Sequence, residues 1–180
     1  MPLPRLSIVL PTLNNEALLI DFFERLSQQT YPRAWLELLV LDGGSTDRTV
    51  ELAKEAGATI IPNPHVLAEP GVNLGLSLAQ GEIVMILAAD NVFKDDNALE
   101  KIVRVFEDSS IYAAFPKHSS NSTDTIFRAT TILSPIHSII LCIRVPPMGG
   151  LSGVSIARSG TPPSMMCMIM PAAQSSPCWL

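Results

Sequence analysis

The sequence contains few of the residues that mark several common classes of protein. Its 180 residues include only three cysteines (142, 167 and 178), and their spacing matches no metal-binding or redox motif. The 12 Lys and Arg face 17 Asp and Glu, and this net charge of -5 argues against nucleic-acid binding, which needs clustered positive charge. No G-x-G-x-x-G or G-x-x-x-x-G-K-[ST] motif is present, which counts against dinucleotide-binding and P-loop sites.

Long apolar runs are also lacking. The apolar stretch 132–145 is shorter than the roughly 20 residues that a membrane span needs, and Pro135 and His137 interrupt it. The first residues, MPLPR, do not have the basic and then apolar pattern of a signal peptide. We therefore expect a cytoplasmic chain without a transmembrane helix, and leave membrane association open for a complete form.

Acidic residues are absent from the last part of the chain. All 17 lie between Glu16 and Asp124, and residues 131–180 carry only two charges, Arg144 and Arg158. This stretch also holds seven of the 15 prolines and shows neither helical nor strand periodicity. We therefore predict a folded domain over residues 1–130 and a poorly ordered or foreign tail over residues 131–180. A frameshift or truncation would explain such a tail, and a natural tail is the alternative.

Strand and helix patterns alternate through the first 130 residues. Short apolar runs predict strands, and amphipathic stretches predict the helices between them. Ser45 is expected to cap the second helix and Gly57 to end it. This alternation indicates βαβ units and an α/β fold with a mostly parallel, doubly wound sheet. The expected strands are residues 6–10, 36–41, 59–61, 83–87 and 111–115.

Polar segments follow three of these strands, at residues 11–16, 42–47 and 88–91. Ligands of parallel α/β sheets bind beyond the carboxyl ends of the strands, so these segments are the candidate site. In the second segment, Asp42 offers a carboxylate and is followed by two glycines that permit close approach of the backbone. The same residues are also explained by a strand-to-helix turn, which needs glycines and a capping residue. This segment alone leaves both interpretations open.

Five motifs occur in order along the chain: residues 7–16 (SIVLPTLNNE), 29–32 (QTYP), 38–49 (LLVLDGGSTDRT), 73–75 (NLG) and 79–82 (AQGE). Together and in this order they resemble the motifs of family 2 glycosyltransferases. The resemblance covers roughly residues 6–115. It implies the GT-A fold and transfer, with inversion, of a sugar from a nucleotide-diphosphate sugar to a hydroxyl acceptor, which is a glycan or a lipid-linked molecule. It also implies a role in cell-envelope polysaccharide biosynthesis.

By position, the resemblance also implies a set of site residues. Asp42 would hydrogen-bond the nucleobase. Asp90 would correspond to the last aspartate of the family's Asp-x-Asp motif and, with Asn91, would hold Mg²⁺ or Mn²⁺ at the diphosphate. The residues implied to bind the nucleotide sugar are Pro11, Thr12, Asn14, Glu16, Asp42, Gly43, Gly44, Ser45, Asp47, Asn73, Ala89 and Asp90.

Departures from the family pattern bear on activity. The first aspartate of Asp-x-Asp falls on Ala88, and Leu13 and Val72 stand where an aromatic residue and an arginine are common. The family's catalytic base lies beyond the donor-binding half, and no carboxylate follows Asp124, so the base is unknown here. We therefore expect a donor-binding half whose transfer activity is impaired. The alternatives are a non-catalytic nucleotide-sugar-binding domain, an inactive fragment, and a receiver-type module, which would need an acidic pair after its first strand.

Overall fold

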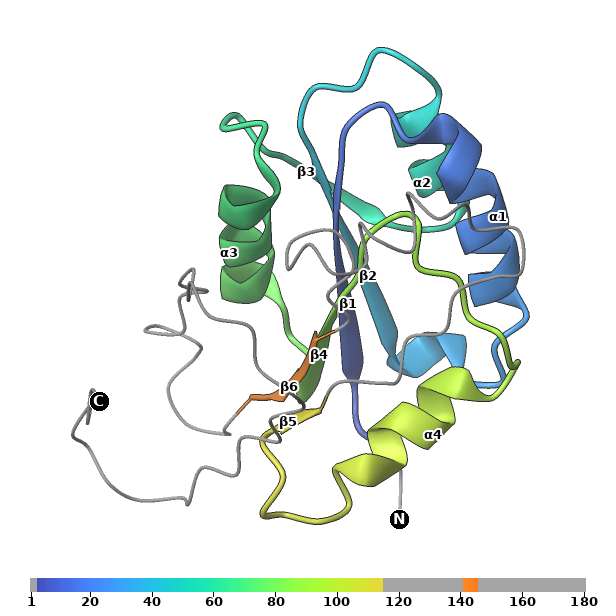
Figure 1. Cartoon of the computed structure of the whole chain (residues 1–180), viewed down its shortest axis with the longest axis vertical. Coiled ribbons are helices and arrows are strands. Elements are labelled where there is room, and N and C mark those ends of the chain that lie inside the picture. Colours follow the sequence, from blue (N-terminus) through green and yellow to red (C-terminus); the bar gives the residue numbers. More distant parts are fainter. Residues whose placement is uncertain (1–2, 115–140, 146–180) are drawn as a thin grey trace, which may run out of the picture.

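The computed structural model describes residues 3–114 and 141–145, which form one six-stranded sheet with helices on both faces (Figure 1). The strand order is β3-β2-β1-β4-β6-β5. β1 pairs in parallel with β2 and β4, and β2 pairs in parallel with β3, whereas β6 runs antiparallel to β4 and β5. The strands are β1 (Leu6–Thr12), β2 (Leu36–Asp42), β3 (Thr59–Pro62), β4 (Ile83–Ile86), β5 (Ala113–Ala114) and β6 (Leu141–Arg144).

Helices cover the two faces unequally. The described helices are α1 (Glu16–Ser27), α2 (Thr49–Glu55), α3 (Ala68–Leu78) and α4 (Ala98–Val105), with a 3₁₀ turn, η1, at Arg33–Trp35. α1, α2 and α4 pack over one face and α3 packs over the other, as the view in Figure 1 shows. The predicted α/β fold with a mostly parallel, doubly wound sheet is confirmed.

The sequence of β1 explains why it lies at the centre of the sheet. Leu6, Ile8 and Leu10 pack into the larger core beneath α1, while Val9 packs into the smaller core beneath α3. A strand with apolar side chains on both faces requires helices on both faces, because either face left open would expose apolar surface to water. Gly75 of α3 permits the close packing on the second face, since a Cβ at this position would lie 2.4 Å from a methyl carbon of Val9.

The order in which successive strands are added to the sheet reverses at β1. The strands β1, β2 and β3 follow one another towards one side, and β4 then returns to the other side of β1. Parallel α/β sheets bind ligands beyond the carboxyl ends of the strands, at the point where the strand order reverses. The sheet thus positions the loops after β1, β2 and β4 along one edge.

Strand β6 lies beyond the predicted domain boundary at residue 130. Its residues pair with β4 from Ile83 opposite Arg144 to Ile86 opposite Leu141. Cys142 is fully buried in the larger core, where desolvation raises the pKa of its thiol to about 12. The expectation of a tail foreign to the fold is therefore wrong for residues 141–145. The rest of the predicted tail lies outside the described residues.

Three local predictions have different outcomes. Gly57 ends the turn after α2 with φ +72°, and its N–H donates to the carbonyl of Lys54 at 2.9 Å, as a C-terminal glycine should. The expected capping role of Ser45 is wrong, because α2 begins at Thr49 and no side chain caps it. The last predicted strand, residues 111–115, is present only as the two residues of β5, and residue 115 lies outside the described part of the chain.

Candidate functional site

Three polar segments meet at the carboxyl edge of the sheet, as their positions after the strands predict. The parallel register places Thr12 at the end of β1 beside Asp42 at the end of β2. The segment after β4 joins them from the other side of β1, where the N–H of Leu87 donates to the carbonyl of Val9 at 3.0 Å. The edge therefore brings together the residue segments 11–16, 42–47 and 88–91.

The carboxylate of Asp42 is held in place by its own loop. The N–H groups of Gly44 and Ser45 both donate to it, at 3.1 Å to Oδ2, and the latter also lies 3.2 Å from Oδ1. Gly44 reaches this position with φ +96°, which a residue with a side chain rarely adopts. A carboxylate has about four acceptor sites, so these two donors leave capacity for a ligand. Asp42 is a half-exposed acceptor fixed at the strand end.

Reciprocal hydrogen bonds join the loops after β1 and β2. Asn14, in the left-handed conformation with φ +50°, donates its N–H to the hydroxyl of Ser45 at 2.9 Å. In return, the side-chain oxygen of Asn14 accepts the N–H of Thr46 at 2.8 Å. The hydroxyl of Ser45 therefore connects two loops instead of capping a helix. This hydrogen bond joins residues 31 positions apart, so a local sequence pattern could not predict it.

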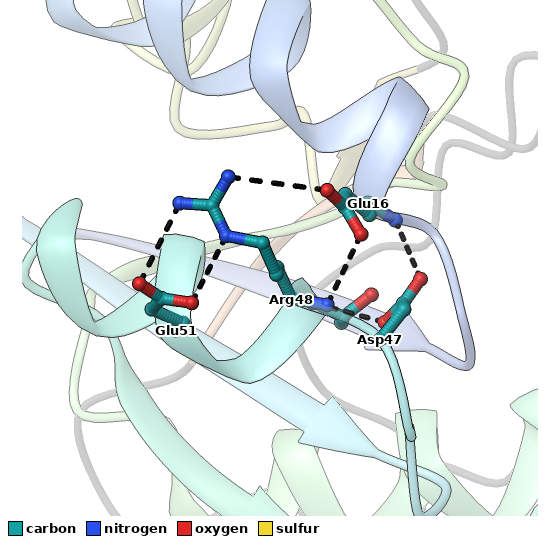
Figure 2. Close-up of polar contacts among 5 residues, drawn as sticks. Glu16, Asp47, Arg48 and Glu51 are labelled. Carbon is teal, nitrogen blue, oxygen red and sulfur yellow. Dashed lines mark hydrogen bonds and ion pairs between the residues drawn. The ribbon is translucent and has the colours of Figure 1, made fainter.

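A second set of contacts connects the starts of α1 and α2. The N–H of Glu16 donates to Asp47 Oδ2 at 3.1 Å, and the N–H of Arg48 donates to Glu16 Oε2 at 3.2 Å. Figure 2 shows the guanidinium of Arg48 between the carboxylates of Glu16 and Glu51. Hydrogen bonds from Thr49, together with the N–H of Glu16, lower the pKa of Asp47. Glu16 and Asp47, expected to line the donor site, are thus engaged in holding two loops together.

The segment after β4 forms a tight turn. The N–H of Asn91 donates to the carbonyl of Ala88 at 3.0 Å, and the N–H of Ala88 donates back to Asn91 Oδ1 at 2.8 Å. The side chain of Asn91 is buried, and its amide nitrogen has no hydrogen-bond partner among the described residues. Asp90, between them, is exposed. Because Asn91 uses its oxygen to close the turn, Asp90 is the better placed of the two predicted metal ligands.

The described residues supply little else for a metal ion. No group of three His, Cys, Asp or Glu side chains in residues 3–114 and 141–145 is arranged to hold one. A single exposed carboxylate suits a divalent cation that takes most of its oxygen ligands from phosphate and water. Asp90 therefore fits a cation shared with a bound diphosphate better than one held by the protein alone.

The remaining predicted residues lie in different surroundings. Thr12 is buried, and its hydroxyl has no partner among the described residues. Ala89 is packed in the larger core, so its side chain is not available to a ligand, and its predicted contact is limited to its backbone. Asn73 is exposed on α3, Pro11 is half-buried in β1, and Gly43 donates its N–H to the carbonyl of Thr12 at 2.9 Å.

A fourth segment at this edge was not predicted. The loop between β3 and α3 lies against the Asp42 loop: the N–H of Asn63 donates to the carbonyl of Asp42 at 2.7 Å. Within this loop Val66 has φ +65°, a conformation that costs a non-glycine residue on the order of 1–3 kcal/mol. A backbone angle of this kind leaves no signature in the sequence, where the one sign of a fixed turn is Asn63 between Pro62 and Pro64.

Comparison with known proteins identifies relatives by sequence. The family described as "Glycosyl transferase family 2" matches residues 7–156, a range that includes β6. The chain is 30% identical over 108 residues to the 4,4'-diaponeurosporenoate glycosyltransferase of Staphylococcus haemolyticus, a match covering 56% of this chain and 28% of that protein. It is 28% identical over 127 residues to the O-antigen chain rhamnosyltransferase WbaN of Salmonella anatum, covering 66% of this chain and 40% of that protein.

Solved structures show the same fold. A mannosyltransferase, PcManGT from Pyrobaculum calidifontis in complex with GDP-Man and Mn²⁺, superposes with a TM-score of 0.63 at 23% sequence identity. The match covers 78% of this chain and 44% of that one. At this identity the likeness establishes the fold, which is GT-A. The chain spans less than half the length of these relatives.

Proposed function

The chain belongs to glycosyl transferase family 2, and from this premise we propose that it binds a nucleotide-diphosphate sugar at the carboxyl edge of its sheet. The observation that carries the proposal is the carboxylate of Asp42, which two backbone N–H groups hold in place while it stays half-exposed. A fixed acceptor beside the point where the strand order reverses suits an N–H of a uracil or guanine base. Gly43 and Gly44 then let the nucleotide approach the backbone.

In the complete enzyme this donor would be used in sugar transfer with inversion. The oxygen of an acceptor hydroxyl attacks the anomeric carbon while the bond from that carbon to the diphosphate oxygen breaks. The hydroxyl proton passes to a base, and the nucleoside diphosphate leaves. The residues at the carboxyl edge act on the donor side of this reaction, because they bind and orient the nucleotide and leave the sugar free to meet an acceptor.

Asp90 is the residue that would bring a divalent metal ion to the donor. A bound Mg²⁺ or Mn²⁺ neutralises the charge that develops on the leaving diphosphate. The PcManGT structure contains GDP-Man and Mn²⁺, which supports the same pairing of donor and metal here. Ala88 supplies no second carboxylate, so we expect the protein itself to hold the cation weakly.

A second candidate function is a non-catalytic nucleotide-sugar-binding domain or an inactive fragment. Its specific support is the absence of any carboxylate after Asp124, where this family's acceptor half would supply the base. General-base catalysis typically contributes about 10²–10⁴-fold to a rate. We propose that the 180-residue chain binds its donor but transfers sugar poorly.

The acceptor is proposed from the relatives alone. The Salmonella anatum relative is an O-antigen chain rhamnosyltransferase, which supports a glycan or lipid-linked acceptor in cell-envelope polysaccharide biosynthesis. Among the described residues no helix has the length and apolar character to cross a membrane.

Calorimetry with the full chain tests the proposal. UDP and GDP, each with and without Mn²⁺, are titrated into the wild type, Asp42→Ala and Asp90→Ala. Loss of Asp42 removes a base contact and should weaken binding by about 1–3 kcal/mol, or about 5- to 150-fold in Kd. Loss of Asp90 should abolish the gain from Mn²⁺ and leave metal-free binding unchanged.

Asp21→Ala serves as the matched control. Asp21 is an exposed carboxylate on α1 that faces Arg25 at 3.8 Å, so its loss changes the charge equally without touching the carboxyl edge. Equal affinity of the wild type and Asp42→Ala would remove Asp42 from the site. Binding of neither nucleotide by the wild type would refute the proposed function as a whole.

A further inference from the structure

The loop between β3 and α3 combines backbone strain with exposed apolar side chains. Val66 has φ +65°, although its branched Cβ makes this region especially unfavourable. Its side chain is 48% exposed and that of the following Leu67 is 65% exposed. Neither strain nor exposure helps the domain to fold. A residue that is both strained and solvent-facing is therefore a candidate for a functional role.

The rest of the loop holds Val66 in this conformation. The side-chain amide of Asn63 donates to the carbonyl of Leu67 at 2.8 Å, and the N–H of Val66 donates to the carbonyl of Asn63 at 3.0 Å. The N–H of Leu67 also donates to the carbonyl of His65 at 2.7 Å. The last of these bonds closes a γ-turn centred on Val66, whose positive φ glycine would accept without strain and asparagine with less strain than valine.

The turn lies directly against the Asp42 loop. A Cβ built on Gly43 would lie 3.3 Å from the carbonyl oxygen of Val66 and 3.4 Å from the carbonyl oxygen of Thr12. Both neighbouring loops therefore reach the residue that follows Asp42. Thr12 is followed by Leu13, whose side chain is 39% exposed. Exposed aliphatic residues, Val66 and Leu13, thus belong to the two loops that adjoin the Asp42 loop.

We propose that Val66 is a nucleobase-positioning residue, which covers one face of the base whose edge is hydrogen-bonded by Asp42. This inference rests on the proposed function and deepens it. A nucleobase has flat faces that gain from burial against apolar atoms and a polar edge that needs a partner. An exposed aliphatic residue near a fixed acceptor matches both needs. A sugar carries hydroxyls around its ring and has no comparable flat apolar face, and a phosphate, an anion without a donor, is repelled by the carboxylate.

Substitution by glycine separates strain from contact. Val66→Gly accepts φ +65° without penalty, so the melting temperature should rise by about 2–4 °C. The same change removes the aliphatic cover, so the Kd for UDP and for GDP should increase about 3- to 10-fold. Inorganic pyrophosphate with Mn²⁺, a probe without a base, should bind the variant and the wild type equally. A merely structural residue would not produce opposite changes in stability and affinity.

Two further variants serve as controls for this experiment. Val66→Asn tolerates the left-handed conformation but is polar, so it should weaken UDP binding as glycine does, and it replaces the glycine variant if that one does not fold. Leu78→Ala, which removes a side chain 45% exposed at the other end of α3, should leave the Kd unchanged.

Three outcomes would overturn the inference. The first is unchanged UDP and GDP affinity in both Val66 variants while Asp42→Ala still weakens binding, which would leave the proposed function intact. The second is an equal loss of affinity for pyrophosphate, which would place Val66 away from the base. The third is a lower melting temperature for Val66→Gly, which would show that glycine relieves no strain. If the wild type binds neither nucleotide, the proposed function fails, and this inference fails with it.

Discussion

At the amino ends of the central strands, polar side chains are paired, whereas at the carboxyl ends two buried polar side chains have an atom without a partner among the described residues. The hydroxyl of Ser7 in β1 donates to Glu37 in β2 and accepts the N–H of Gly81, which precedes β4, at 2.8 Å. Glu37 also accepts the N–H of Gln80 at 2.8 Å and faces Arg5 at 3.6 Å. One compact network thus joins three strands at their start.

The carboxyl edge is built from similar residue types but behaves differently. The hydroxyl of Thr12 and the amide nitrogen of Asn91 are buried without a partner among the described residues, Asp90 is exposed, and Val66 is strained. Buried polar groups are nearly always paired, so two exceptions on one edge indicate groups kept for a ligand or for water. Polar groups are thus paired at the amino ends of the strands, as stability requires. Unpaired groups and a strained backbone occur at the carboxyl ends, where function is proposed.

The largest expected effect is steric and concerns Gly81. A Cβ there would lie 2.6 Å from the backbone nitrogen of Ser7 and 2.8 Å from the carbonyl oxygen of Ile83, so backbone would have to move. Gly81→Ala should lower the free energy of unfolding by about 3 kcal/mol in urea denaturation. At the other edge Gly44→Ala meets no atom within 4 Å and should lose only about 1 kcal/mol, through its φ of +96°. Equal losses would contradict the contrast between the two edges.

A pair of hydroxyl deletions should change stability in opposite directions. Ser7→Ala leaves the buried N–H of Gly81 unpaired and should cost about 2 kcal/mol in the free energy of unfolding. Thr12→Val replaces an unpaired buried hydroxyl by a methyl group of similar size and should gain about 1 kcal/mol. Urea denaturation curves of both variants measure these two changes in the free energy of unfolding. A loss of stability in Thr12→Val would show that its hydroxyl is satisfied in solution.

The smallest expected effect is a pH dependence at the junction of the two loops. Hydrogen bonds from Thr49 and the N–H of Glu16 lower the pKa of Asp47 below its ordinary value of 3.8. Its contribution to stability is therefore complete above pH 3.8 and is lost as the pH falls through its lowered pKa. Melting temperatures of the wild type and Asp47→Asn should differ at pH 7 and converge as the pH falls through the lowered pKa of Asp47. A difference that stays constant over this range would exclude Asp47 as its source.

Much of the fold could be predicted from local patterns. The apolar runs of β1 and β2 identify central strands, since parallel strands are buried on both faces. Gly57 marks the end of α2 because its position needs a positive φ that glycine accepts freely. The polar segments after β1, β2 and β4 had to meet at one edge, because parallel strands end on the same side. That much of the candidate site follows from order along the chain.

Other features could not be predicted, because they depend on partners far away in the sequence. β6 comes from a stretch whose composition indicated a tail, and it is a strand only because β4 offers it a free edge. Ser45 has the chemistry of a helix cap, but the N–H that it meets belongs to Asn14. Ala89, carried into the site by resemblance, is packed in the core.

The sequence by itself determined the alternating elements from β1 to α4 and the edge of the sheet at which the polar segments gather, since both depend on periodicity and order. Tertiary structure decided which polar atoms remain available there. Glu16 and Asp47 bind each other's loops, whereas Asp42 keeps acceptor capacity. It also placed Val66 in a strained turn beside Gly43. Hydrogen-bond partners and backbone angles of this kind arise from packing between distant segments, and no local pattern of residues encodes them.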